Sequence, residues 1–311
     1  MDFKKERVNS HNNWPEIKLF KAEQKFRELL EKRQPIRPFQ QANLQYDSDP
    51  DYQKMIGHFL NGLEALPDRP DYMFDHCFTV IDRAASPLFP SKGITGIVEG
   101  LGKKLMAQSP VEWEGIVDDL TTAMPLSSYR YIAKNICEAH LGSNTHSGYI
   151  VSRVKSFLKS HRYAEFIDKF VVKPGLTLSN PIPHDALQRT ANFLKLYASG
   201  DVATKHVGSS TYPTLDLSNP NNKRSPAKRA EFLLSLYAFI ARNERAHGEL
   251  LSPFRSSKAD LKRYESYYFL AAMTYTFALG VLELRQWGGV TPTDIRRCCS
   301  DNLAIQKALF V

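Results

Sequence analysis

The sequence predicts an all-α fold, a helical bundle preceded by an N-terminal extension, and three observations support this. Apolar residues recur at three- and four-residue steps along most of the chain. The strand-like string Phe170-Val171-Val172 is short, and Pro174 follows it closely. Two long helical patterns lie near the C-terminus, and the second carries an apolar seam. A doubly wound α/β fold is therefore not expected.

Bulk composition indicates a globular protein with a basic surplus. The 311 residues allow one large domain or two modest ones, and the 42% hydrophobic content is ordinary. The net charge of +8 suits a polyanionic partner, although many basic proteins bind no nucleic acid. The N-terminal sequence lacks the apolar segment of a secretory signal, and the cysteines at 77, 137, 298 and 299 lack zinc-knuckle spacing. We expect free thiols and a cytoplasmic location.

One uncharged stretch, Tyr267 to Leu282, requires a test for membrane insertion. It spans 16 residues and contains three tyrosines and two threonines, with charged residues on both sides. A spanning helix needs about 20 predominantly apolar residues. We therefore predict a buried core helix and no membrane association.

The elements are predicted in chain order as an extension, a helical domain and a tail. Residues 1–50 form a basic extension with one helix near 17–32, which ends before Pro35. Residues 51–290 form the helical domain, and residues 291–311 a C-terminal tail. Within the domain we expect helices at 52–66, 74–85, 111–123, 127–140, 146–159 and 184–198, and a polar surface loop at 200–225.

Residues 226–287 are predicted to form an antiparallel helical hairpin. The first helix begins near Ser225 and Pro226 and ends at Gly248, a suitable C-terminal cap. The second begins near Ser256 or Ser257 and runs to Trp287. Its seam contains Leu261, Tyr264, Tyr268, Ala271, Tyr275, Ala278 and Leu282.

The end of the first hairpin helix carries the residues with the clearest chemical potential, Arg242, Asn243 and His247. Asn243 and His247 are four residues apart and share a helix face, whereas Arg242 lies about 140° from His247 around an ideal helix. A histidine titrates near neutral pH, and an arginine presents donors that match phosphate oxygens. These residue types suit metal-independent cleavage of a phosphodiester.

The string Arg242-Asn243-x-x-x-His247, placed between an aromatic-rich helix and a second long helix, resembles the motif of the HEPN family. The resemblance covers about 60 residues, 226–287, and implies a helical bundle of HEPN type. It also implies a metal-independent endoribonuclease without a cofactor, of the kind found in toxin, anti-phage defence and RNA-processing systems. Family members often form homodimers whose active site is composite.

The resemblance and the residue chemistry together suggest specific roles. His247 is the expected general acid or base, Arg242 stabilises the transition-state phosphate, and Asn243 positions the reacting groups. Because one copy supplies one motif histidine, a homodimer would supply both an acid and a base for attack by the 2′-hydroxyl.

Local charge agrees with an RNA partner. Residues 221–263 contain ten basic and four acidic side chains, which suits salt-sensitive contacts to a phosphate backbone. The expected RNA-binding residues are Arg245, Lys223, Arg224, Lys228, Arg229, Arg255, Lys258 and Lys262.

Two other interpretations of the motif remain open. The chain is alternatively a non-catalytic HEPN-like module that binds RNA or a protein. The motif is alternatively a capping network in a structural bundle, with His247 stabilised by the negative end of the helix dipole. The string Gly100-Leu-Gly102-Lys103-Lys104 lacks the Ser or Thr of a phosphate loop, and Cys137, His140 and His146 lack a fourth zinc ligand. We expect no metal site there.

Overall fold

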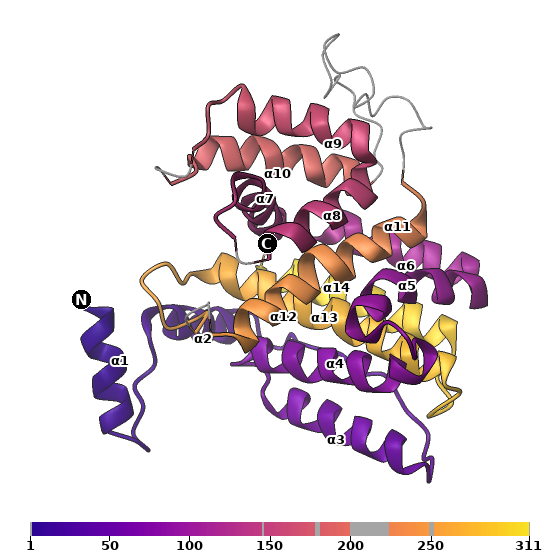
Figure 1. Ribbon diagram of the computed structural model, residues 1–311. Helices are drawn as coiled ribbons and strands as arrows, with labels where there is room; N and C mark the ends of the chain where they lie inside the picture. Colours follow the sequence, from indigo (N-terminus) through magenta and orange to yellow (C-terminus); the bar gives the residue numbers. More distant parts are fainter. Residues whose placement is uncertain (1, 145, 178–180, 200–223, 249–251, 311) are drawn as a thin grey trace. The chain divides into compact units, whose positions relative to one another are not determined.

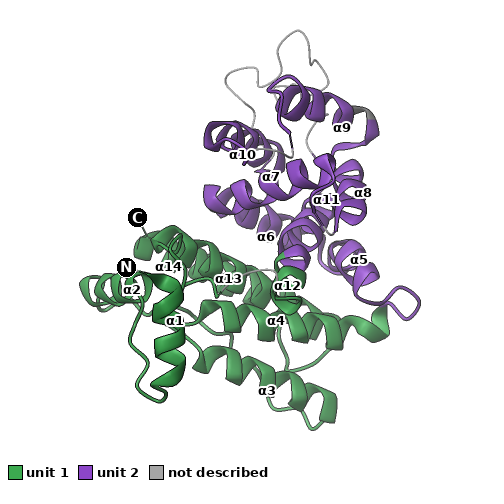
Figure 2. Ribbon diagram, turned by 60° about the vertical axis from the view of Figure 1, so that its left-hand side comes forward, with its two compact units in different colours: residues 1–88, 241–311 green, residues 89–240 purple. Residues whose placement is uncertain are grey.

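The computed structural model describes residues 2–144, 146–177, 181–199, 224–248 and 252–310. Every regular element in these ranges is helical, which confirms the all-α prediction (Figure 1). The predicted loop at 200–225 lies almost entirely outside the described residues. The chain divides into two compact units, residues 1–88 with 241–311 and residues 89–240 (Figure 2). This division differs from the predicted extension, single domain and tail.

Unit 1 is built from both ends of the chain. Its helices are α1 (Phe3–Asn12), α2 (Lys21–Lys32), α3 (Pro50–Glu64), α4 (Pro70–Ala85), the short 3₁₀-helix η1 (Ser86–Leu88), most of α12 (Phe239–Ala246), α13 (Leu261–Leu284) and α14 (Pro292–Phe310). Helix α13 packs against α4 and α14, and α3 packs against α4.

Helix α13 is the core of unit 1. It is long and apolar enough to cross a membrane by length and composition, and 94% of its most apolar window is buried inside the protein. Tyr264 stacks between Phe26 and Phe254, with ring centroids 4.0 and 3.9 Å away. The predicted core helix is thus confirmed by burial. It begins at Leu261 behind the N-cap Asp260 instead of at Ser256 or Ser257, because the Asp260 carboxylate accepts the Arg263 amide.

Residues 292–310, which were predicted as a C-terminal tail, form helix α14. Cys298 and Cys299 are buried in it, and Asn302 accepts a hydrogen bond from the Gln40 amide at 2.9 Å. The Ala42 amide donates to the Tyr275 hydroxyl of α13 at 3.1 Å. Part of the predicted extension therefore packs on the core of unit 1.

Unit 2 is a separate helical cluster. Its elements are α5 (Gly93–Gln108), α6 (Pro110–Ala123), α7 (Leu126–Leu141), α8 (Ser147–Leu158), α9 (Ser160–Ile167), the π-helix η2 (Asp168–Val172), α10 (His184–Ser199), α11 (Pro226–Glu231) and the π-helix η5 (Phe232–Ala238). Its core contains Trp113, Tyr129 and Tyr197, each fully enclosed.

Two segments of unit 2 that were not predicted as helices are helical in the structure. The strand-like residues 170–172 continue a helix, because Phe170 packs between Phe166 and Phe193 with centroids 5.0 and 5.2 Å away. The glycine-containing string at 100–104 lies inside α5, a helix that was not predicted. A Cβ at Gly102 would lie 2.5 Å from the Ala230 Cβ, so this glycine allows α5 and α11 to pack closely.

Candidate functional site

The Arg242, Asn243 and His247 motif lies at the C-terminal end of α12, in unit 1. The His247 amide donates to the Asn243 carbonyl at 2.9 Å, and the Gly248 amide donates to the Arg245 carbonyl at 3.1 Å. Gly248 has φ +69°, a left-handed conformation that glycine adopts without steric cost. The predicted glycine cap is therefore confirmed, and it ends the helix directly after the motif.

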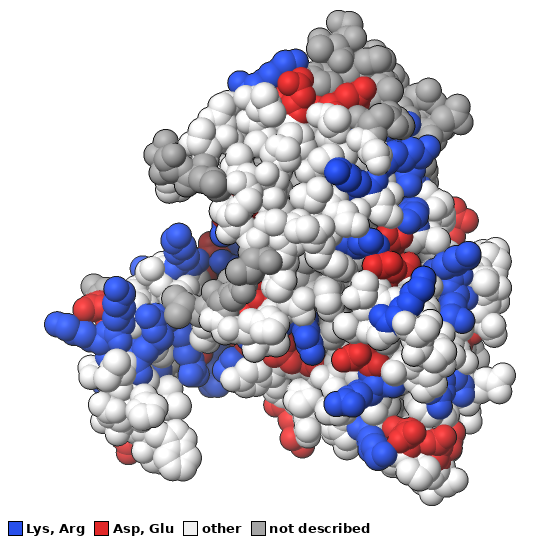
Figure 3. Space-filling view, in the orientation of Figure 1, with Lys and Arg blue, Asp and Glu red and all other residues white. Residues whose placement is uncertain are grey.

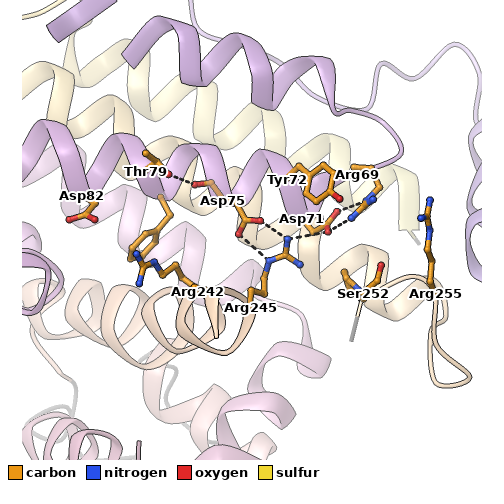
Figure 4. A pocket seen from close by; sticks show the side chains of 13 residues that line it. Arg69, Asp71, Tyr72, Asp75, Thr79, Asp82, Arg242, Arg245, Ser252 and Arg255 are labelled. Carbon is orange, nitrogen blue, oxygen red and sulfur yellow. Dashed lines mark hydrogen bonds and ion pairs between the residues drawn. The ribbon is translucent and has the colours of Figure 1, made fainter. Parts of the chain in front are cut away.

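A cavity of about 460 Å³ lies within unit 1, between α4, the end of α12 and residues 252–255 (Figure 4). Its wall contains four arginines and three aspartates. The described residues that line it are Arg69, Asp71, Tyr72, Asp75, Phe78, Thr79, Asp82, Arg242, Arg245, Ala246, Ser252, Pro253 and Arg255. The convergence of these polar groups makes the cavity a candidate binding site in this unit.

Two cavity arginines are held by aspartates of α4. Asp71 is fully buried, and it pairs with Arg69 at 2.7 Å and with Arg245 at 3.2 Å. The Arg245 Nε also donates to Asp75 at 3.0 Å. Burial alone would lower the pKa of Arg245, but the hydrogen bonds and charge of Asp75, followed by the charges of Tyr267 and Asp71, raise it above its usual value. Arg245 therefore serves first as an anchor between α12 and α4.

Arg242 differs from Arg69 and Arg245 in having no ion pair with a described carboxylate. Its Nη1 donates to the Asn243 Oδ1 at 3.1 Å, and among the described residues no carboxylate forms an ion pair with it. The side chain is half-buried and contributes to the cavity wall (Figure 4). Of the four cavity arginines, Arg242 is thus the one whose charge the described carboxylates leave uncompensated.

His247 is exposed and lies in the turn that follows α12. It is not one of the described residues that line the cavity. The structure consequently brings Arg242 to the cavity with Asn243 hydrogen-bonded to it, and places His247 outside the cavity wall. The three motif residues therefore lie near the same helix end, but of the three only Arg242 is among the described residues that line the cavity.

The predicted RNA-binding residues of unit 2 are mostly engaged in the protein. Arg229 is fully buried, ion-paired with Asp118 and hydrogen-bonded to Thr121, so its guanidinium does not reach the surface of the described structure. Lys228 pairs with Glu231 at 2.6 Å and donates to Ser156 at 2.9 Å. Arg224 is half-buried, and Lys223 lies outside the described residues.

The predicted RNA-binding residues of unit 1 differ in their exposure and in whether they form ion pairs. Arg255 lines the cavity but pairs with Glu23 at 2.9 Å. Lys258 and Lys262 are exposed. Figure 3 shows Lys and Arg gathered over α1, α2 and the segment before α13 on the visible face of this unit. Unit 1 therefore has a basic surface. Helices α1 and α2 contribute to it, in addition to the predicted basic region within 221–263.

Sequence reasoning missed the residues of α4 that complete the cavity. Tyr72 is 45% exposed, and the Arg69 guanidinium lies 3.7 Å from the centre of its ring (Figure 4). No local pattern indicates these residues, because α4 is separated from α12 by more than 150 positions in the chain. Their contribution depends on the packing of unit 1.

The described ranges contain no cluster of three or more His, Cys, Asp or Glu side chains arranged to hold a metal ion. His140, once considered beside Cys137, instead lies 3.1 Å from the Tyr163 hydroxyl. Burial raises the pKa of the Cys137 thiol to about 12, so this sulfur stays protonated at neutral pH.

Comparison with models of known protein families, with characterised proteins and with solved structures gives no match.

Proposed function

We propose that this protein is a HEPN-type, metal-independent endoribonuclease in which Arg242, Asn243 and His247 act on the phosphodiester. The observation that carries the proposal is the position of Arg242 in a solvent-open cavity wall without a described carboxylate partner. A guanidinium in that state retains its donors for phosphate oxygens.

The proposed reaction is an attack of the ribose 2′-oxygen on phosphorus. The 2′-hydroxyl proton leaves to a base, the bond from phosphorus to the 5′-oxygen breaks, and an acid protonates that oxygen. The products are a 2′,3′-cyclic phosphate and a 5′-hydroxyl end. Arg242 stabilises the added charge on the phosphoryl oxygens, and Asn243 keeps the guanidinium oriented through their hydrogen bond.

His247 is proposed to supply proton transfer from the turn beyond α12. Its exposure leaves the imidazole accessible to an RNA strand or to a second copy of the chain. A homodimer would bring a second His247, so that one imidazole serves as base and the other as acid. The exposed lysines Lys258 and Lys262 would add contacts to the RNA backbone.

A second candidate is a non-catalytic HEPN-like module that binds RNA or a protein. Two observations favour it. His247 lies outside the cavity wall, and Arg245 is neutralised by Asp71 and Asp75. This module would bind RNA in a salt-dependent manner without turnover, and binding would be insensitive to His247.

The decisive experiment is incubation of purified full-length protein with a fluorescent single-stranded RNA, with and without EDTA. The wild type should produce fragments with 2′,3′-cyclic phosphate ends at equal rates in both conditions. His247→Ala should lower the rate by about 10²- to 10⁴-fold while the circular dichroism spectrum is unchanged.

The matched control is His184→Ala, which removes another exposed imidazole, at the start of α10 in unit 2. This variant should cleave at the wild-type rate. Retained cleavage in His247→Ala would remove His247 from the mechanism. Binding without any cleavage by the wild type would favour the non-catalytic module.

A further inference from the structure

Two histidines on neighbouring helices of unit 1 face each other at hydrogen-bonding distance. His58 belongs to α3 and His76 to α4, and their Nδ1 atoms are 3.2 Å apart. The ring centroids are 5.5 Å apart and the ring planes are inclined by 41°. Both side chains are half-buried, so solvent reaches the pair. Neither residue lines the cavity or belongs to the motif.

The separation of the two nitrogens matches the spacing required by a chelated metal ion. With Zn–N bonds of about 2.0–2.1 Å and a tetrahedral angle, two nitrogen ligands lie about 3.3 Å apart. Imidazole nitrogen suits zinc, nickel and copper, and two ligands leave the remaining coordination positions to water. We propose that His58 and His76 form a surface site for a divalent transition-metal ion of the zinc class.

The close packing of α3 and α4 holds the two rings at this distance. Gly62 lies one turn after His58, and a Cβ there would meet the Met73 Sδ at 2.6 Å and the His76 Cβ at 3.4 Å. Met73 of α4 is fully buried, and Phe59 of α3 is buried against Tyr275 of α13. Because the helices are fixed before an ion arrives, little ordering free energy is lost on binding.

Neutral imidazoles keep a lone pair for a metal ion. Arg83 lies close enough for its charge to act on His58. Without an ion, the Nδ1–H of one ring donates a hydrogen bond to the Nδ1 of the other. The Arg83 charge opposes a cation, so affinity depends on simultaneous binding by both imidazoles.

The test is calorimetric titration of untagged full-length protein with Zn²⁺ and, separately, Ni²⁺. The wild type should bind one ion through the two imidazoles. His58→Gln and His76→Gln should each weaken that binding on the order of a hundredfold, because chelation is lost. The control, His184→Gln, should bind as the wild type does. Equal affinity in all four proteins would overturn the proposal.

A spectroscopic measurement on the wild type tests the site without any substitution, so its result does not depend on whether the variants fold. Cu²⁺ bound at one equivalent should show hyperfine coupling to two imidazole nitrogens in its electron paramagnetic resonance spectrum. Coupling to one nitrogen, or to none, would contradict the site. Zn²⁺ should also raise the melting temperature of the wild type, because an ion that binds the folded state stabilises it.

Discussion

Basic residues at the two ends of the helical segment 226–246 differ in whether a carboxylate is paired with them. At the first end, in unit 2, Arg229 is fully enclosed and paired with Asp118, and Lys228 is paired with Glu231. At the second end, in unit 1, Arg242 lies in a cavity wall without a described carboxylate partner. Both ends carry arginine, and both were predicted to contact RNA.

The comparison shows that an arginine in this sequence has one of two roles, either stabilising the packed interior or binding a ligand. A buried arginine that is paired and hydrogen-bonded contributes to a specific packing arrangement, and its desolvation makes it unavailable to a ligand. An arginine at a solvent-open wall keeps its donors for an incoming phosphate. The predictions that follow separate these two uses.

The largest expected effect is on catalysis at the second end. Arg242→Ala should lower the RNA cleavage rate by about 10²- to 10³-fold, because one donor to the developing phosphoryl charge is lost. The free energy of unfolding in urea should fall by no more than about 1 kcal/mol, the usual contribution of one hydrogen bond such as that to Asn243. Arg296→Ala, which removes an exposed arginine of α14, is the control and should cleave normally. Normal cleavage by Arg242→Ala would end the proposed role.

The next effect is on stability at the first end. Asp118→Asn should destabilise unit 2 by about 3 kcal/mol, because it leaves the enclosed Arg229 charge without its ion pair. Urea unfolding followed by circular dichroism measures this loss. The double variant Asp118→Asn with Arg229→Met should recover much of the stability, since no unpaired charge remains. A single variant as stable as the wild type would show that the pair is dispensable.

A smaller effect concerns RNA affinity at the cavity. Tyr72→Ala should weaken binding of a single-stranded RNA by about 1–3 kcal/mol, the usual contribution of one base stacked on an aromatic ring. Tyr72→Phe should bind almost as the wild type does. Tyr46→Ala removes a tyrosine that is 86% exposed and serves as the control in a fluorescence anisotropy titration. An effect of equal size in both alanine variants would argue against stacking in the cavity.

The smallest expected effect comes from removing the ion pair between Asp75 and Arg245. Asp75→Asn should leave Arg245 paired with Asp71 alone and make the cavity more positive. RNA binding should tighten about fivefold at low salt, the roughly 1 kcal/mol that a unit charge contributes at 4 Å in water. The gain should disappear at high ionic strength, where charges are screened. Unchanged affinity at low salt would indicate that RNA does not approach this wall.

The predicted helices were those with strong local signals. Apolar periodicity located the helices that begin at Pro50, Pro70, Pro110 and Leu126 to within a few residues. Helix α5 was missed because its glycines suggest a loop, although Gly102 serves close packing against Ala230. Helix α14 was missed because its pattern is mixed, and its burial comes from contacts with α13.

The sequence by itself determined the all-helical class, the buried helix around Tyr275 and the end of α12 at Gly248, because each depends on residues close together in the chain. Only the tertiary structure decided which arginines face a ligand and which are enclosed. Arg242 and Arg229 have the same side chain, and each is followed two residues later by a glutamate. Their environments are set by Asn243 on one side and by Asp118, more than 100 positions away in the chain, on the other. Long-range packing fixes such partners, and no local pattern records them.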